Sequence, residues 1–354
     1  MKKSSMNFLE TMMKTPSPSG YEHKLRKVWS EEMKKYSDEV KIDVHGNIVA
    51  SINPDKRPRI MLAGHMDELG FQVEYINDKG FIYFNHLGGF DIAIIPGRKV
   101  RIHTKQGDIL GVTGKKAIHL FEKKDREKVP KRHELYIDIG ANDKKEVQKY
   151  VEIGDPITYD FNIEELRNGL YISRGFDDKI GAFIVAEVLK NVYRKKSELN
   201  AALFSVATCQ EEVGLRGART SAYGIDPQIG VAIDVTHGTD TPDVDVKKVG
   251  EIKLSEGAAI SRGPNINPKV FEILLSVAKK KKIKYQVEAA PRPTGTDANV
   301  IQITRAGVAT GLVSIPCRYM HTYTELISMK DVESAINILT EFCLSVDEKT
   351  DFTP

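Results

Sequence analysis

Apolar runs of strand length alternate with helix-like patterns near the start of the chain and again through its second half. The clearest run, AALFSVA at 201–207, has almost no polar residue, which is typical of a strand buried on both faces of a sheet. Alternation of such strands with amphipathic helices predicts a three-layer α/β/α domain built of βαβ units. The predicted elements of the second half are helices from 179, after 213, over 268–281 and over 329–346, and strands over 201–207, 229–235 and 308–314.

The segment 71–160 has a different character. Short alternating strands such as FQVEYI, RKVRIH and DPITYD follow one another between turn signals, without a long helical pattern. This is typical of a small β-barrel or sandwich, here with a charged, exposed loop over 121–133. We therefore predict a β-rich domain at 70–164, inserted into an α/β domain that comprises residues 1–69 and 165–354.

Two adjacent acids, Glu211 and Glu212, lie just after the strand predicted at 201–207, where a helix is expected to begin. Active sites of open α/β sheets gather at this end of their strands. Neighbouring side chains diverge by about 100° in a helix and about 180° in a strand, so one carboxylate can bind a metal while the other moves a proton. The alternative is an ordinary acidic helix start, which the helix dipole favours.

Five residues of metal-ligand type share this kind of position. Four follow apolar, strand-like segments and one precedes an apolar helix; they are His65, Glu212, Asp234, His321 and, before the helix, Asp177. If the strands are parallel, all of them converge on one edge of the sheet. Imidazole and carboxylate without thiolate suit zinc, cobalt or manganese, and the set is too large for one open site. Two metals about 3.5–4 Å apart, bridged by a carboxylate and a water, would use every one.

Each of these residues also has an ordinary structural explanation. The two histidines fit satisfied core positions, Asp234 fits the end of a strand, and Asp177 fits the N-cap of the helix predicted from 179. Each candidate alone favours the ordinary explanation. The occurrence of all five together favours a metal centre.

Composition narrows the class of protein. The net charge of +3, with acids and bases interspersed, gives no reason to expect nucleic acid or an anionic membrane as a partner. No run reaches the ~18 consecutive apolar residues of a transmembrane span, and no signal-peptide pattern is visible. The three cysteines, Cys209, Cys317 and Cys343, form no CxxC pair, which predicts a reduced, cytoplasmic protein.

A series of motifs in the right order along nearly the whole chain resembles the glutamyl aminopeptidase family of dinuclear metallopeptidases. The motifs are SPSGYE, AGHMDELGF, LGGFD, PGRKVRI, LYIDIGA, GFDDKIGA, QEEVGLRGA, GTDA and RYMH. This family includes the tetrahedral aminopeptidases and members formerly labelled endoglucanases. The resemblance implies an enzyme that removes N-terminal residues from peptides with two divalent ions per subunit, zinc or cobalt foremost and manganese as a further option. It also implies that the inserted domain is a PDZ-like dimerisation barrel and that dimers assemble into dodecamers.

The resemblance assigns the candidate ligands to two metal positions. His65 and Asp234 would hold one ion. Glu212 and His321 would hold the other, with Asp177 bridging the two.

The resemblance also implies roles around the metals. Asp67 would contact the imidazole of His65 without binding a metal itself and would thereby orient it. Glu211 would be the general base and acid acting on a metal-activated water. The segment Gly295, Thr296 and Asp297 would line the substrate pocket, although Thr296 and Asp297 also fit an ordinary helix cap.

Two positions depart from the family pattern. Lys179 stands two residues after the bridging aspartate, where an arginine is expected, and this change would alter hydrogen bonds around the bridge. Tyr323 follows His321 by two residues, where serine and proline are more usual nearby, and its bulk is expected to narrow the substrate pocket.

Other functions remain open on the sequence. A related di-metal deacylase or carboxypeptidase would not require a free α-amino group. A glycoside hydrolase using Glu211 with another acid would not require a metal. The remaining class is a non-enzymatic binding or scaffold protein. No residue identifies the preferred N-terminal residue of a substrate.

Overall fold

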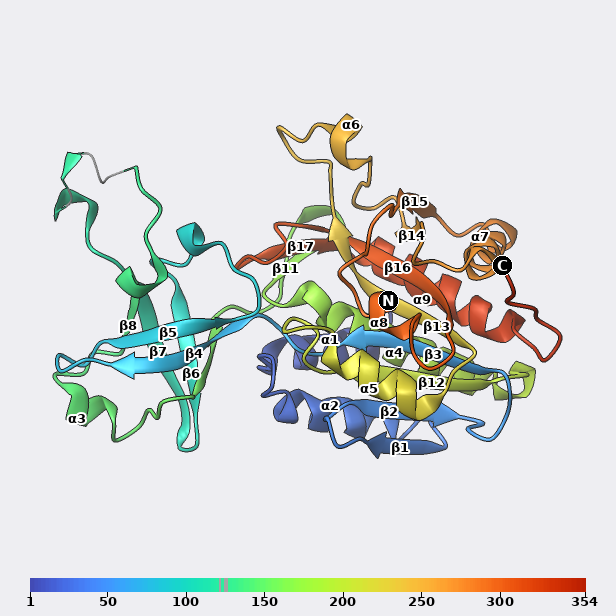
Figure 1. The fold of residues 1–354 in the computed structure, drawn as a ribbon, viewed down its shortest axis with the longest axis horizontal. Helices are drawn as coiled ribbons and strands as arrows, with labels where there is room; N and C mark the ends of the chain where they lie inside the picture. The colour runs from blue at the N-terminus through green and yellow to red at the C-terminus, as the bar shows by residue number, and fades with distance from the viewer. Residues whose placement is uncertain (121, 124–126) are drawn as a thin grey trace.

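The structure is a computed structural model that describes residues 1–120, 122–123 and 127–354. It consists of an α/β body with a β-barrel projecting from one side (Figure 1). The predicted charged loop over 121–133 therefore falls partly outside the described residues, at 121 and 124–126.

The body is built on an 11-stranded mixed sheet. Its centre is a parallel group in the order β12 (Ala202–Thr208), β3 (Arg59–His65), β13 (Ile229–His237) and β16 (Ala309–Arg318). Most residues of these strands are buried, as their continuous apolar sequences predict. Antiparallel strands extend the sheet on both sides: β1 (Glu39–Ile42), β2 (Ile48–Ile52), β10 (Glu164–Glu165), β11 (Leu170–Ser173), β14 (Ala258–Arg262), β17 (Glu325–Ser328), with β15 (Tyr285–Ala289) parallel to β14.

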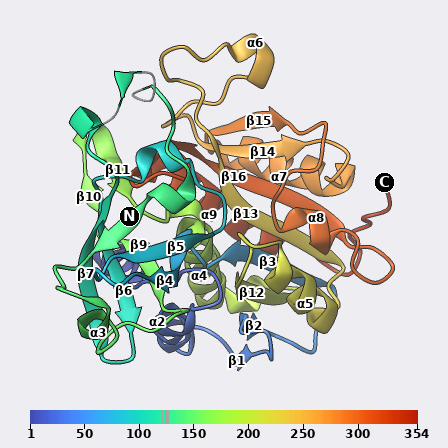
Figure 2. The same ribbon diagram turned by 60° about the vertical axis from the view of Figure 1, so that its left-hand side comes forward.

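Helices cover both faces of this sheet (Figure 1, Figure 2). One face carries α4 (Phe176–Arg194) against β3 and β12, with α9 (Met329–Ser345) beside it and α7 (Pro268–Lys281) next to α9. The N-terminal helices α1 (Lys3–Lys14) and α2 (His23–Met33) pack on α4. The opposite face carries α5 (Arg216–Ile225) and the short α8 (Ala298–Ile301). None of the described helices is long and apolar enough to cross a membrane.

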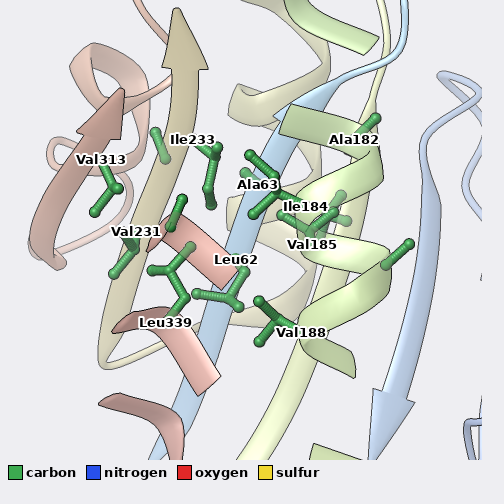
Figure 3. Packing of buried hydrophobic residues seen from close by; sticks show 14 of the residues in the cluster. Leu62, Ala63, Ala182, Ile184, Val185, Val188, Val231, Ile233, Val313 and Leu339 are labelled. Atoms are coloured by element: carbon green, nitrogen blue, oxygen red, sulfur yellow. The ribbon is translucent and has the colours of Figure 1, made fainter. Parts of the chain in front are cut away.

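The main core lies between the parallel strands and the helices α4 and α9. Figure 3 shows Leu62 of β3 and Val231 of β13 beside Val188 of α4 and Leu339 of α9, all of them fully buried. α4 approaches β3 very closely at Gly64, because a Cβ there would lie 2.3 Å from the main-chain carbon of Gly181. Glycine at this position therefore allows the helix to lie directly on the end of the strand.

The inserted segment forms a closed barrel of antiparallel strands in the order β4-β5-β8-β7-β6-β9. Alternate residues such as Val100 and Ile102 fill its interior, and Phe71 lies at the centre of an aromatic cluster with Phe84 and Phe90. The strands are β4 (Gly70–Ile76), β5 (Ile82–Leu87), β6 (Lys99–Thr104), β7 (Gly107–Gly114), β8 (Tyr136–Asp138) and β9 (Pro156–Tyr159), and the short α3 (Lys144–Val147) lies before β9.

The predicted class, an α/β domain with helices on both faces of its sheet and an inserted β-barrel, is confirmed. The helix predicted after 213 begins later, at Arg216, because residues 209–215 form a turn that carries the adjacent glutamates. The strands β10, β11, β14, β15 and β17, which lie outside the parallel centre, and the four-residue helix α6 (Val246–Val249) were not predicted, because short or partly polar segments give weak periodicity.

Replacement of Gly64 by alanine should destabilise the protein by about 1–3 kcal/mol, because the added methyl group collides with the backbone of α4 rather than with a flexible side chain. Gly224 of α5 is the matched control, since a Cβ there meets no atom within 4 Å and Gly224→Ala should be neutral or slightly stabilising. Urea unfolding of both variants measures the difference. Equal stability of the two would contradict the close packing of α4 on β3.

Candidate metal centre

The carboxyl ends of the central strands place the candidate residues at one edge of the sheet. His65 is the last residue of β3 and pairs in register with Thr208, the last residue of β12, so Glu211 and Glu212 follow directly beside it. Asp234 lies near the end of the neighbouring β13. The remaining two candidates come from the start of α4 and from the loop after β16.

Asp177 lies between the two histidines. Its Oδ1 is 3.2 Å from Nε2 of His65, and its Oδ2 is 3.1 Å from Nε2 of His321. Hydrogen bonding to these imidazoles lowers the pKa of Asp177 although burial opposes the shift. One carboxylate thus presents a separate oxygen to each histidine, which is the arrangement of a carboxylate that bridges two metals.

Asp178, the residue after Asp177, has a structural role. Its Oδ2 accepts the main-chain N–H of His65 at 3.1 Å, and its Oδ1 accepts the N–H of Gly181 at 2.9 Å in the first turn of α4. Residues 177 and 178 have non-helical backbone angles, so the regular helix begins at Lys179 as predicted. The helix-start role that was the alternative explanation for Asp177 therefore belongs to Asp178.

The adjacent glutamates point toward different histidines. Oε2 of Glu211 is 3.8 Å from Nε2 of His65, whereas Oε2 of Glu212 is 4.0 Å from Nε2 of His321. Both side chains are largely buried. This separation agrees with the expectation that the two acids can do different work.

Asp67 supports both the histidine and the glutamate turn. Its main-chain oxygen lies 3.0 Å from Nδ1 of His65, while its carboxylate Oδ1 is 3.5 Å away. The same carboxylate accepts the N–H groups of Glu211 at 3.0 Å and Glu212 at 3.2 Å, and the hydroxyl of Ser19 at 2.7 Å. Asp67 therefore fixes the backbone of the neighbouring loop, and the contact nearest to the imidazole comes from its main chain.

A second supporting acid, Glu325 at the start of β17, was not singled out from the sequence. It accepts the N–H of Asp177 at 2.9 Å and the N–H of His321 at 3.0 Å. Burial, and next the charge of Asp177, raise the pKa of Glu325. The available signal was an acid at the first position of a short apolar strand, which in the sequence is indistinguishable from an exposed edge residue.

The departure at Lys179 is explained by another acid that sequence reasoning missed. The ammonium group of Lys179 is fully buried and donates to Glu68 at 2.7 Å and to the main-chain oxygen of Thr15 at 2.9 Å. Arg174 pairs with the same carboxylate at 3.2 Å. Lys179 thus stabilises the backbone around the site without contacting Asp177 in any described hydrogen bond.

Asp297 lies just before α8 and is not held as an ordinary cap. Its Oδ2 accepts the hydroxyl of Thr208 at 2.7 Å, and its side chain makes no capping bond to the helix. Its Oδ1 is buried without a hydrogen-bond partner among the described residues. Burial raises the pKa of Asp297 to about 6, and its charge in turn contributes to the raised pKa of Glu211.

The site fits cations because its negative charge is buried and incompletely compensated. Burial is the largest cause of the raised pKa of Glu212 and of Asp234, to about 8 for the latter, and the charge of Asp177 adds to both shifts. Oε1 of Glu212 is buried without a hydrogen-bond partner in the described part of the chain. The ligand atoms of His65, Asp177 and Glu212 lie within 4.8 Å of one another, as do those of His65, Asp178 and Asp234. Divalent ions supply the missing positive charge at low cost, whereas unpaired buried carboxylates are expensive.

Binding of a divalent ion to metal-free protein should release protons. With its pKa at about 8, the carboxyl of Asp234 carries a proton near neutral pH, and burial raises the pKa of Glu212 as well. An ion binds the deprotonated forms. Apparent affinity should therefore rise with pH up to about 8. Calorimetric titration of chelator-treated protein with Zn²⁺, in buffers of different ionisation enthalpy, measures the released protons. Affinity that is independent of pH would contradict this picture.

The chain is similar to known aminopeptidases in sequence and in fold. The family model for M42 glutamyl aminopeptidase matches residues 46–338. The chain is 38% identical to lysyl aminopeptidase of Pyrococcus furiosus over 349 residues, 98% of each protein. The TET aminopeptidase of a marine sediment Thaumarchaeota archaeon is 32% identical, with a TM-score of 0.94 over 98% of this chain and 97% of that one. The TET1 peptidase of Pyrococcus horikoshii, which can assemble into a tetrahedron or a large octahedral shell, is 28% identical, with a TM-score of 0.86 over 97% of this chain and 100% of that one. The chain belongs to the M42 glutamyl aminopeptidase family and is a metalloaminopeptidase.

Proposed function

We propose that the chain hydrolyses the first peptide bond of peptides with a free N-terminus at a centre that binds two divalent ions. The observation that supports this most is the position of Asp177, whose two oxygens face two different imidazoles. His65 and Asp234 would hold one ion, and Glu212 and His321 the other, with Asp177 shared between them.

Zinc or cobalt, and manganese as a further option, suit these nitrogen and oxygen ligands. Such ions polarise a carbonyl group and lower the pKa of a bound water, which is the chemistry that the reaction needs from them. The three cysteines are free and buried, in agreement with a reducing, cytoplasmic environment.

Glu211 is the proposed general base and acid. It lies at the edge of the ligand group, with Oε2 3.8 Å from Nε2 of His65, and its main chain is fixed by Asp67. Burial, together with the charges of Asp234 and Asp297, raises the pKa of Glu211. Bound cations would lower it again, toward the range in which a carboxylate takes a proton from water and returns it to the leaving amine.

The segment Gly295, Thr296 and Asp297 is the proposed border of the substrate pocket. Asp297 is buried close enough to the site for its charge to act on Glu211. Its oxygen without a partner among the described residues is suited to a cationic group, which supports the proposal that a substrate ammonium is recognised in this part of the site.

The substrate preference can be measured directly. Chelator-treated protein is tested on lysyl, glutamyl and leucyl p-nitroanilides after addition of Zn²⁺, Co²⁺ or Mn²⁺, with N-acetylated analogues as controls. The 38% identity to a lysyl aminopeptidase makes the lysyl substrate the first candidate. Metal-restored cleavage of the free amines alone supports the proposal, whereas equal cleavage of the acetylated compounds would favour a deacylase.

We also propose that residues 70–164 are an inserted dimerisation domain and that residues 1–69 and 165–354 form the catalytic domain. The closed barrel over β4 to β9 and the existence of a dodecameric relative support this assignment. Dimers joined through the barrel would then assemble into a dodecamer, and light scattering that finds only monomers at micromolar concentration would contradict it.

Glu211→Gln should lower kcat by ~10²–10⁴-fold and keep both metal ions, because glutamine preserves the shape but cannot take a proton. Glu212→Gln is the matched comparison, since it removes a proposed ligand and should lower the bound metal. Metal content by plasma mass spectrometry, with kcat on the same samples, separates the two roles. A Glu211→Gln protein that has lost metal would show that Glu211 is a ligand instead.

A further inference from the structure

The ring of Tyr323 is partly buried and packs against the core of the barrel, although the residue lies in the loop between β16 and β17 that also carries His321. Its ring centroid is 5.4 Å from that of Tyr159, at the end of β9, and 4.9 Å from that of Phe161, just beyond it. The guanidinium carbon of Arg98, next to β6, lies 4.7 Å from the centre of the same ring. These contacts direct the tyrosine toward the barrel, whereas the sequence suggested a role in narrowing the substrate pocket.

The two histidines at the site are held very differently. The side chain of His65 is 2% exposed, and its Nδ1 lies 3.0 Å from a main-chain oxygen. The side chain of His321 is 41% exposed, and among the described residues its Nδ1 makes no hydrogen bond. A metal-binding imidazole generally needs a partner on its second nitrogen to fix the ring, so the orientation of His321 depends on its loop instead.

That loop has a conformation that its own sequence does not favour. Tyr319 and His321 both have positive φ angles, 60° and 61°, which are unfavourable for residues other than glycine. Such angles persist where the surroundings determine them. The N–H bond from His321 to Glu325 holds the loop from the sheet side, and the ring of Tyr323 holds it from the barrel side.

The barrel reaches the same two ligands through its own backbone. Gly88 follows β5, and a Cβ there would lie 3.5 Å from Oε2 of Glu212. At Gly89 it would lie 3.8 Å from Nδ1 of His321. The position formed by Glu212 and His321 thus borders the barrel, whereas His65 and Asp234 are residues of the central strands.

We propose that Tyr323 is a positioning residue through which the inserted barrel sets the affinity of one metal position, the one formed by Glu212 and His321. The position formed by His65 and Asp234 is held by the sheet and is largely independent of the barrel. This inference rests on the proposed two-metal centre. Packing of the barrel against another subunit would therefore change the affinity for one ion of the pair.

The test is calorimetric titration of chelator-treated protein with Co²⁺, together with the visible absorption of each bound ion. The wild-type protein should bind two ions, and binding of only one would contradict the proposed function itself. Tyr323→Ala should weaken one of the two ions by ~10–100-fold and leave the other unchanged, as loss of an outer partner of a ligand does. Tyr323→Phe keeps the ring and should bind both ions as the wild type does.

Phe161→Ala removes the ring that faces Tyr323 without changing the sequence of the loop that carries His321. It should therefore weaken the binding of the same ion, and it can be measured even if Tyr323→Ala does not fold. The double variant should lose no more affinity than the stronger single variant, because both changes break the same contact between the rings of Tyr323 and Phe161. Two ions bound with unchanged affinity by folded Tyr323→Ala would overturn the inference while leaving the two-metal centre intact. Additive losses in the double variant, or equal weakening of both ions, would also overturn it.

Discussion

The structure depends on keeping several carboxylates close together and out of water. Unpaired buried charge costs several kcal/mol for each group, so such a cluster persists only where the acids are hydrogen-bonded, protonated or neutralised by cations. Parallel strands supply the position, because their carboxyl ends and the helix that packs on them meet at one edge. The acids gathered there are Asp67, Asp177, Asp178, Glu211, Glu212, Asp234 and Glu325.

These acids divide the work of the site between them. Asp67, Asp178 and Glu325 accept main-chain N–H groups and thereby hold the backbone of the loops. Asp177 directs its two oxygens toward the two imidazoles, whereas Glu212 has one oxygen without a hydrogen-bond partner among the described residues. A carboxylate that holds a loop and one that faces the imidazoles thus lie side by side, and the rigid backbone of the first positions the second.

Much of the site could be predicted from the sequence because its residues follow strong patterns. His65 is the last residue of one long apolar strand and Glu211 lies shortly after the end of another, where the position of a side chain follows largely from the strand itself. Glu325 and Asp297 could not be assigned in the same way, because Glu325 contacts Asp177 across 148 residues of chain and Asp297 contacts Thr208 across 89. The direction of Tyr323 depends on the packing of the barrel, which no local pattern records.

The barrel is inserted between β3 and β10, so the chain leaves the sheet beside His65 and returns to it at Glu164, shortly before Asp177. The hydrogen bond from the N–H of His65 to Asp178 joins residues 113 positions apart and fastens the two points to each other. Segments from both sides of the insertion also pair within one parallel sheet, where β3 lies between β12 and β13. Continuity of the chain through the barrel is therefore not what holds the two halves of the catalytic body together. A chain cleaved in an exposed barrel loop would retain its sheet as two non-covalently associated fragments.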